Sequence, residues 1–345
     1  MHHWEPLQTD HDEILVVVGM TEEEEELEVP PSWVSDPSSE VRRPPAAPKQ
    51  TLLETLRGLG VDRGDTLLVH SSFKACRATF GTTEPMMALD QLFEAVGTTF
   101  GGNIMMPTFC HGCPSVFDLE QSDGKSGALS EVMRRLPISR RSQHPTHAVS
   151  VVGVDADSLT RGHTGEAFGL GSPLDRLAAL PRGKVLLLGV NHMASSLIHL
   201  AETYAGIPKR CKYGEPPPFC EMRVGGKPCG RHQLGRTASC SVAFEAVALI
   251  LKRGGVLRYA NRPGCTLQLI TSAKRAVELV AKALCDDPKM LLCGDPHCVA
   301  CTTTAELLAR GLRDKRSNGE ARSQETPAEK RARADAEALD IHDSN

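Results

Sequence analysis

Aromatic residues are scarce in this chain, where phenylalanine, tyrosine and tryptophan together make up 4% of 345 residues. A buried core must therefore be aliphatic, and the 40% hydrophobic content supplies enough side chains for one large α/β domain or two smaller ones. The formal net charge of −4 provides no overall attraction for nucleic acid or an acidic membrane. We therefore expect neither of these as a partner.

Long apolar runs are also missing. Residues 14–18 form a run too short to cross a bilayer, and the first residues have no basic start of the kind that precedes a signal peptide. The 12 cysteines are scattered along the chain, whereas disulfide-stapled proteins are short and secreted. The sequence therefore predicts a cytoplasmic protein with free thiols. It contains neither a Walker-type phosphate loop nor a G-x-S-x-G nucleophile elbow.

The two ends of the chain predict disordered tails. Residues 22–26 are an unbroken run of glutamates, and several prolines follow them as far as residue 48. Such a segment cannot bury enough apolar surface to offset its loss of chain entropy. Residues 313–345 carry mixed charge without an apolar period. We expect tails over residues 1–48 and 313–345 and one folded domain over residues 49–312.

Between these tails, short aliphatic segments alternate with segments of helical periodicity. Helices are expected at residues 52–59, 86–96, 129–136, 196–204, 244–252, 273–284 and 304–310, and strands at residues 66–69, 104–106, 148–154 and 184–188. Apolar strands that alternate with helices are typical of a sheet covered on both faces. The predicted fold class is therefore α/β.

Small polar residues follow three of the expected strands. His70, Ser71 and Ser72 follow the first strand, and Thr108 follows the second. A third strand leads through a glycine-containing loop into the helix that carries His199. Ligands bind at the carboxyl ends of strands in α/β sheets. Short hydroxyl side chains there can bond phosphate or amide groups of a ligand without steric hindrance. Strands also end in such residues without any function, so each position alone is a weak signal.

The strongest local pattern is the pair formed by His199 and Glu202. Residues three apart share one face of a helix, so the two side chains would project together. Imidazole accepts a proton near neutral pH, and a neighbouring carboxylate orients the ring or attracts a cation. The functional interpretation is therefore a general base with its orienting acid. The alternative is an ordinary pair on a helix surface.

A second polar cluster, at residues 140–147, includes Ser142 and His144. It is either an anion contact or a polar loop with a proline turn. A third cluster brings Cys293, His297, Cys298 and Cys301 within nine residues, which is close to structural zinc spacing. This cluster is either a zinc site or a solvent loop with free thiols. Residues 110–113 are a weaker version of the same pattern.

Taken in order, several motifs resemble those of the aminoglycoside 3-N-acetyltransferase family. The similar segments are residues 60–73, 101–109, 141–149, 169–174 and 185–202. The last is the most diagnostic, because an apolar strand is followed by Ser196 and then by His199-Leu200-Ala201-Glu202. The resemblance covers about residues 50–285. It implies the fold of that family, with a central mixed sheet flanked by helices.

The resemblance implies direct transfer of an acetyl group from acetyl-CoA to a primary amine of an aminoglycoside or a similar amino-sugar or polyamine. It gives His199 the role of general base, and Glu202 the role of holding the imidazole or the incoming ammonium group. No metal is required for this chemistry. The implied partners are CoA and a small-molecule amine, the implied biology is antibiotic resistance, and the chain would act as a monomer or homodimer.

The resemblance also implies where the coenzyme binds. The expected coenzyme contacts are His70, Ser71, Ser72, Thr108, Ser142 and His144. Backbone N–H groups near Ser71 and Ser72 would stabilise the thioester oxyanion, which is usually a large contribution to catalysis.

The sequence departs from the family pattern just before the helix that carries the expected base. The family usually has an aspartate that faces the aminoglycoside, and Met193 stands there instead. Residues 211–229 and 293–301 also look like insertions relative to compact bacterial members. Two alternatives therefore remain open: a CoA-binding protein with impaired catalysis, and a zinc-stabilised interaction protein of the same fold.

Overall fold

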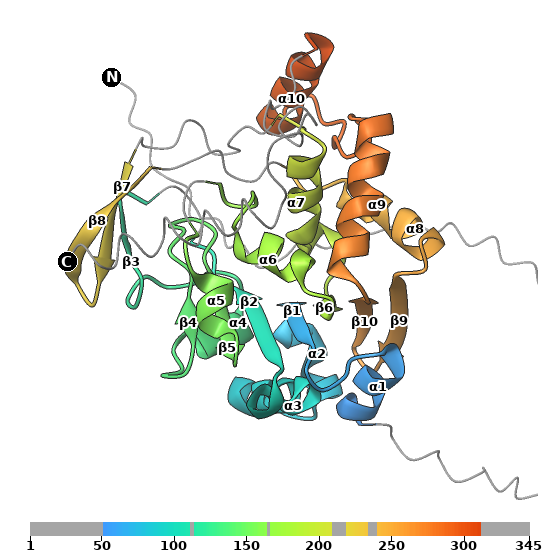
Figure 1. Cartoon of the computed structure of the whole chain (residues 1–345). Helices are drawn as coiled ribbons and strands as arrows, with labels where there is room; N and C mark the ends of the chain where they lie inside the picture. Colours follow the sequence, from blue (N-terminus) through green and yellow to red (C-terminus); the bar gives the residue numbers. More distant parts are fainter. Residues whose placement is uncertain (1–50, 111–113, 164–165, 209–218, 234–239, 312–345) are drawn as a thin grey trace, which may run out of the picture. The chain divides into compact units, whose positions relative to one another are not determined.

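The computed structural model describes residues 51–110, 114–163, 166–208, 219–233 and 240–311. The tails expected at residues 1–48 and 313–345 lie outside these ranges. Helices cover both faces of a seven-stranded sheet, and a three-stranded sheet lies to one side of it (Figure 1). The expected α/β class is therefore confirmed. No helix among the described residues is long and apolar enough to span a membrane.

The large sheet is mixed, with the strand order β4-β5-β2-β1-β6-β10-β9. Its strands are β1 (Thr66–Ser71), β2 (Asn103–Pro107), β4 (Arg140–Arg141), β5 (Val149–Gly153), β6 (Gly183–Leu188), β9 (Leu257–Arg262) and β10 (Cys265–Ile270). β1 lies in the centre and runs parallel to both of its neighbours, β2 and β6. All other pairs in this sheet are antiparallel. The carboxyl ends of β2, β1 and β6 therefore lie side by side at one edge.

The seven expected helices are present, most of them with shifted bounds, and three further helices in the described residues, which begin at Phe73, Ala156 and Pro173, were not expected. They are α1 (Leu52–Leu59), α2 (Phe73–Phe80), α3 (Pro85–Val96), α4 (Ala128–Arg134), α5 (Ala156–Thr160), α6 (Pro173–Ala179), α7 (Leu197–Tyr204), α8 (Val247–Arg253), α9 (Ala273–Asp286) and α10 (Val299–Ala309), with short 3-10 turns η2 (Thr98–Phe100), η3 (His192–Ala194) and η4 (Phe244–Ala246). Local capping explains several of the boundaries. Thr51 and Glu54 form a reciprocal capping box at the start of α1. Ser72 caps α2, since its hydroxyl accepts a hydrogen bond from the Ala75 N–H.

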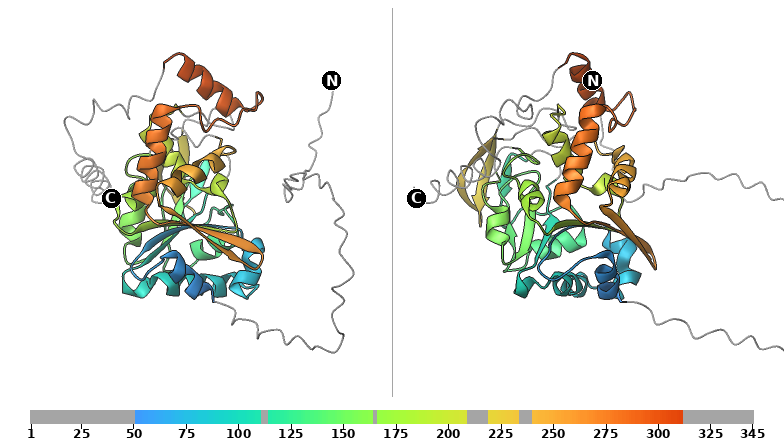
Figure 2. Two further views of the ribbon diagram at one scale, coloured as in Figure 1. Left: turned by 90° about the vertical axis from the view of Figure 1, so that its right-hand side faces the viewer. Right: turned by 45° about the vertical axis from the view of Figure 1, so that its right-hand side comes forward.

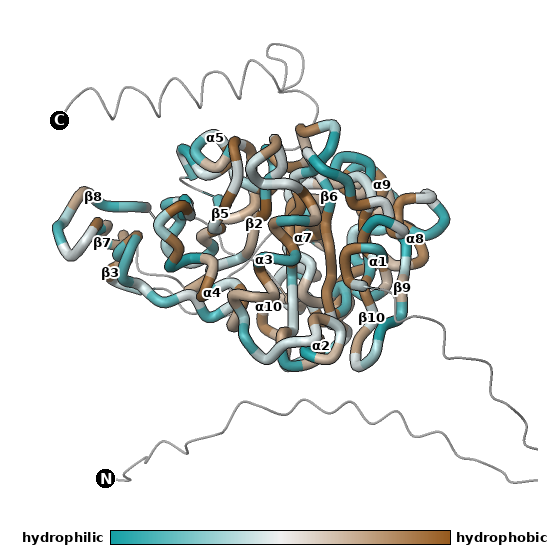
Figure 3. The backbone as a smooth tube through the Cα atoms, turned by 90° about the horizontal axis from the view of Figure 1, so that it is seen from below, coloured by the Kyte–Doolittle hydropathy of each residue, from teal (hydrophilic) through white to brown (hydrophobic). Residues whose placement is uncertain are grey.

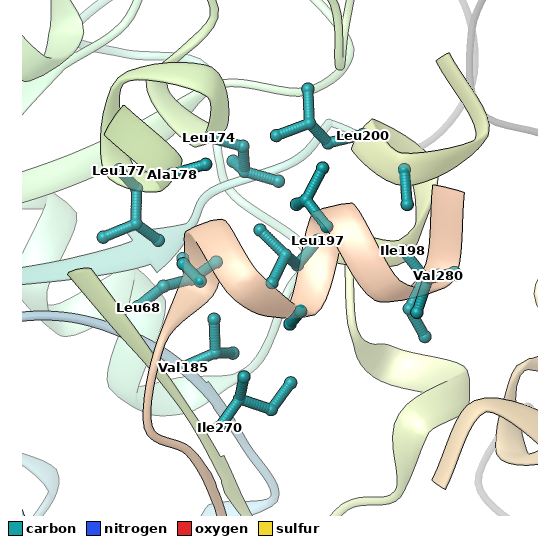
Figure 4. Close-up of a cluster of buried hydrophobic side chains, with 14 of the residues drawn as sticks. Leu68, Leu174, Leu177, Ala178, Val185, Leu197, Ile198, Leu200, Ile270 and Val280 are labelled. Carbon is teal, nitrogen blue, oxygen red and sulfur yellow. The ribbon is translucent and has the colours of Figure 1, made fainter. Parts of the chain in front are cut away.

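Two aliphatic layers, one on each face of the large sheet, make up the core. Leu67 and Val69 of β1 pack in the layer beneath the sheet with α1, α2, α3 and α4, and Leu68 packs in the opposite layer with α6, α7 and α9. Figure 2 shows helices on both sides of the strands, and Figure 3 shows the apolar character of the central strands. In Figure 4, Leu68 and Val185 of the sheet face side chains of α6 and α7, including Leu197. The scarcity of aromatics is thus compensated by branched aliphatic packing on both faces.

The hairpin formed by β9 and β10 was not anticipated from the sequence. Its strands pair with each other, and β10 also pairs antiparallel with β6. The turn contains Pro263 and Gly264, and Gly264 has a φ of +83°, which a residue with a side chain rarely adopts. The proline–glycine pair marks a turn, but the polar and exposed residues of β9 hid the first strand of the hairpin.

The small sheet has the order β3-β7-β8, with β3 (Val116–Asp118), β7 (Phe219–Val224) and β8 (Lys227–Gln233). β7 and the first residues of β8 belong to the segment 211–229 that looked like an insertion, and residues 211–218 of that segment lie outside the described ranges. Phe117, Cys220 and Met222 form a small core of their own together with Ala148, the residue before β5. Residues from this segment therefore join β3 in a second sheet with a separate small core.

Candidate functional site

The three expected strand ends come together at one edge of the large sheet. β1 ends at Ser71, Thr108 follows β2 directly, and Gly189 follows β6. The Ser72 N–H donates to the Leu188 carbonyl at 2.9 Å. This N–H was expected among the oxyanion donors, but it is used to close the end of the sheet.

The loop from β6 to α7 depends on glycine at its first position. Gly189 has a φ of +67°, and a Cβ placed there would lie 2.5 Å from the Cys76 sulfur. A side chain at this position would therefore be both strained and too close to α2. The resulting sharp turn leads from the end of β6 through η3 into α7, which lies on the face of the sheet with α6 and α9 (Figure 1).

The start of α7 is tied to the end of β1. The Ser196 N–H donates to His70 Nε2 at 3.4 Å, and the Ser196 hydroxyl lies 3.2 Å from the same nitrogen. His70 Nε2 must therefore carry a lone pair, which places the ring proton on Nδ1. Burial also lowers the pKa of His70 to about 3. His70 is therefore neutral near pH 7 and is too weak a base to take a proton from an amine.

His199 and Glu202 form a buried pair on α7. His199 Nδ1 lies 2.7 Å from Glu202 Oε2, and the two residues are 7% and 4% exposed. A carboxylate only accepts hydrogen bonds, so Nδ1–H is the donor and Nε2 holds the lone pair. The carboxylate thus fixes the tautomer and the orientation of the ring. The pair expected from helical spacing is present, and it is buried rather than on the helix surface.

Two phenylalanines hold the imidazole between them. The Phe168 ring stacks on His199 with centroids 5.1 Å apart and planes 19° apart. The Phe244 ring meets it edge-on at 4.7 Å and 62°. Thr203 Oγ1 donates to the Phe168 carbonyl at 2.8 Å, which anchors that loop to α7. Sequence reasoning missed both rings. No local signal in the sequence joined either phenylalanine to His199, because both lie on segments distant from α7 in the chain.

The expected coenzyme residues on β2 and in the 140–147 loop make internal hydrogen bonds. Thr108 Oγ1 donates to the Ala148 carbonyl at 3.2 Å. Ser142 Oγ accepts from the Val149 N–H at 2.8 Å and lies 2.9 Å from His163 Nδ1. His144 Nδ1 accepts from the His147 N–H at 3.1 Å. These side chains shape the loop, and their contact with coenzyme stays a prediction.

Met193 stands where the resemblance implies an acid, and another acid lies beside it. Met193 is 41% exposed in η3, directly after His192. The His192 N–H donates to Glu245 Oε2 at 3.0 Å, so η4 places an exposed carboxylate next to this position. Burial lowers the pKa of His192, and the negative charge of Glu245 opposes that effect. A negative charge is therefore retained near Met193, supplied from a different element.

The cysteine cluster differs from the one expected. His297 is exposed and is not part of it, whereas Cys240 joins Cys293, Cys298 and Cys301. The histidine was chosen from proximity in sequence, but the turn before α10 leaves it in solvent. Cys240 lies far earlier in the chain and gave no local signal. Of the weaker motif, residues 111–113 lie outside the described ranges, and Cys110 Sγ contacts the Asp123 carbonyl.

Comparison with known proteins places this geometry in context. The family model described as aminoglycoside 3-N-acetyltransferase matches residues 68–284. Aminoglycoside N(3)-acetyltransferase III of Acinetobacter baumannii is 33% identical over 183 residues, which cover 47% of this chain and 62% of that protein. A type III enzyme of Salmonella sp is 30% identical over 247 residues, covering 62% of this chain and 85% of that protein.

Solved structures have the same fold. The apoenzyme of aminoglycoside acetyltransferase AAC(3)-IVa matches with a TM-score of 0.62 and 27% identity, covering 76% of this chain and 99% of that one. A mutant of that enzyme in complex with a gentamicin matches with a TM-score of 0.63 and 28% identity, covering 75% and 98%. On the match to the family model over residues 68–284, this chain belongs to the aminoglycoside 3-N-acetyltransferase family.

Proposed function

We propose that this protein transfers an acetyl group from acetyl-CoA directly to a primary amine of an aminoglycoside or a similar amino-sugar or polyamine. The observation that carries the proposal is the buried pair of His199 and Glu202, joined at 2.7 Å on α7 beside the strand ends. Family membership supports the reaction class. The aligned part spans 62% of several curated relatives, so their activity is carried over as part of this proposal.

In this mechanism His199 Nε2 takes a proton from the acceptor amine as the amine nitrogen attacks the thioester carbonyl. The C–N bond forms, the C–S bond breaks, and the imidazolium returns the proton to the CoA thiolate. Glu202 stabilises the positive charge on the imidazolium by accepting a hydrogen bond from His199 Nδ1–H. General-base catalysis of this kind contributes about a hundred- to ten-thousand-fold in rate. No covalent enzyme intermediate and no metal ion is needed.

Two other features support His199 as the base. The His199 ring is held by Phe168 and Phe244, so it loses little rotational freedom when the amine binds. His70 is another imidazole at the strand ends, and burial lowers its pKa to about 3. We assign His70 to positioning α7 through Ser196, and not to proton transfer.

We propose a cationic amine as the acceptor. The structure of the AAC(3)-IVa mutant with a gentamicin shows that one relative binds an aminoglycoside. In this chain the exposed Glu245 carboxylate lies beside the position where Met193 replaces the family aspartate. The Glu245 carboxylate attracts an ammonium group, although it is supplied by η4 and not by η3, which carries Met193. We therefore propose that the range of accepted amines differs from that of the bacterial relatives.

The coenzyme in this proposal is acetyl-CoA, bound at the carboxyl ends of β1 and β2. Ser71, Ser72 and Thr108 lie there, and we propose that they contact the pantetheine arm. A protein of the same fold, AAC-IIIb, has been solved as a binary complex with CoASH. Acetyl-CoA and the free thiols of the described cysteines both fit a cytoplasmic setting.

The test is release of CoA thiol with acetyl-CoA and a panel of aminoglycosides and polyamines. We expect turnover by the wild-type chain and a loss of about a hundred- to ten-thousand-fold in His199→Ala. His297→Ala is the matched control, because that histidine is exposed and distant in sequence, and it should retain full activity. Equal turnover by wild type and His199→Ala would contradict the mechanism. Calorimetric binding of CoA without turnover on any amine would favour a binding protein with impaired catalysis.

A further inference from the structure

Four cysteine side chains converge at the start of α10. Cys298 is the N-cap of α10, Cys301 lies in its first turn, and Cys293 precedes it by a short loop. Cys240 comes from the segment before η4. Their sulfur atoms all lie within 4.8 Å of one another. Side chains from two separate parts of the chain therefore meet at one point.

We propose that these four thiolates bind one zinc ion. Zinc takes four ligands in a tetrahedron at about 2.3 Å from sulfur, which separates the sulfurs by about 3.8 Å. Cysteines spaced as C-x2-C at the start of a helix, such as Cys298 and Cys301, are a usual half of such a site. Cys240 and Cys293 supply the remaining two ligands. The sulfur atoms, now within 4.8 Å of one another, would need to approach to about 3.8 Å to complete the tetrahedron.

A backbone N–H group is aimed at one of the sulfurs. The Cys293 N–H donates to Cys301 Sγ at 3.4 Å. Hydrogen bonds of this kind orient metal ligands and stabilise negative charge on sulfur. The N–H of one proposed ligand residue therefore supports the thiolate form of another, which is the form that a metal ion requires.

The surroundings of the cluster lack an ordinary core. The described residues that pack with the cysteines are few, chiefly Ala300 and Leu292. α10 makes no extensive contact with another helix or strand in the described part of the chain. Thr304 Oγ1 does donate to the Pro208 carbonyl at 3.1 Å. So small an apolar cluster cannot hold a helix in place, and a structural metal is a common substitute for such a core.

The ligand set also indicates the kind of site. A set of four sulfurs is soft and closed, which suits zinc in a structural role and leaves no open position for substrate. Binding would convert four thiols and one Zn²⁺ into a tetrathiolate complex and four protons. We therefore assign the metal to fastening α10 to the segment before η4. Acyl transfer needs no contribution from it.

The experiment is metal analysis of the full-length protein purified without chelators. We expect about one zinc per chain, released in step with titration of four thiols by a mercurial reagent. Cys240→Ser and Cys301→Ser should each lose most of the zinc and lower the thermal unfolding temperature. Cys285→Ser is the matched control, because this exposed cysteine on α9 lies outside the cluster. His297→Ala should also keep its zinc, since that residue is exposed and outside the cluster.

Several results would overturn the proposal. They are a wild-type zinc content far below one per chain, iron in its place, and an intact mass that shows disulfides among these cysteines. Retention of zinc by Cys240→Ser would be equally decisive. If the serine variants fail to fold, cobalt replacement in the wild-type chain decides the matter. A thiolate-to-cobalt charge-transfer band with tetrahedral d–d transitions supports the site, and an octahedral spectrum rejects it.

Discussion

Ionisable side chains are buried both at the edge of the large sheet where β1 begins, here called the amino end, and at the edge where β1 ends, here called the carboxyl end. Their roles differ between these two ends. At the amino end, Asp65 is fully buried at the start of the β1 region, where Lys184 Nζ donates to it at 2.7 Å and Arg182 Nε at 3.0 Å. At the carboxyl end, the buried acid Glu202 meets the imidazole of His199. The first acid is neutralised by two permanent cations. The second is paired with a ring that can gain and lose a proton.

This difference separates stability from chemistry. The ion pairs at the amino end join the start of β1 to the segment of β6. At the carboxyl end, the acid holds a tautomer and leaves a basic nitrogen on the ring. We therefore expect substitutions at the amino end to change the free energy of unfolding, and those at the carboxyl end to change turnover.

The largest effect on stability is expected from Asp65→Asn. This variant leaves Lys184 and Arg182 without their carboxylate, and breaking a buried pair costs about 3–5 kcal/mol. Chemical denaturation measures the loss, and turnover per folded molecule should stay unchanged. Asp62→Asn is the matched control, since the exposed Asp62 should change stability by less than about 0.5 kcal/mol. If both variants changed the free energy of unfolding only slightly, the contrast between the two ends would be lost.

A comparable loss of stability is expected on acidification. Burial lowers the pKa of both His70 and His163 to about 3, so below about pH 6.5 the unfolded chain takes up protons that the folded chain refuses. Stability should therefore fall as pH decreases, by about 1.4 kcal/mol per pH unit for each ring. Denaturation at several pH values between about 7 and 5 tests this above the carboxylate range. His163→Asn should reduce the change in unfolding free energy per pH unit. An unchanged slope would contradict the lowered pKa of His163.

At the carboxyl end, Glu202→Gln should lower kcat by about 10- to 100-fold. The amide can still contact His199 Nδ1, but it no longer stabilises the imidazolium formed during proton transfer. The folded state should be retained, in contrast to Asp65→Asn. Steady-state kinetics give the result, with the exposed pair member Glu278→Gln as the control. A Glu202→Gln variant that is destabilised as strongly as Asp65→Asn and keeps the wild-type kcat would reverse the roles of the two ends.

The smallest effect is expected from Glu245→Gln. An exposed carboxylate contributes about 0.2–1 kcal/mol to an ion pair, so KM for a polycationic amine should rise only about two- to fivefold. The increase should shrink at high salt, because exposed charges are screened. Kinetics at two ionic strengths measure both effects. An equal change in KM for a neutral amine substrate would show that Glu245 does not act through its charge.

Much of the fold was predictable from the sequence. The aliphatic segments that became β1, β2, β5 and β6 were visible because both faces of these strands are buried. The helices α1, α3 and α9 were visible from their apolar periodicity. The edge strands β4 and β9 were not, since exposed residues such as Tyr259 interrupt the apolar pattern of a strand with one solvated side.

The candidate site was predictable only in part. His199 and Glu202 are three residues apart on a helix, so local geometry alone joins them. The contacts of His199 with Phe168 and Phe244 join distant segments, and only the folded chain brings them together. The same limit explains why Cys240 was missed. A local motif shows neighbours in sequence, and long-range partners need the topology of the sheet.

The most direct measurement is a crystal structure of the protein with CoA and an aminoglycoside bound. We predict that the acceptor nitrogen lies about 2.6–3.2 Å from His199 Nε2, with the CoA sulfur near the ends of β1 and β2. Glu202 should remain on Nδ1. A complex in which both ligands bind away from His199, or in which the ring stays enclosed by protein on all sides, would contradict the account.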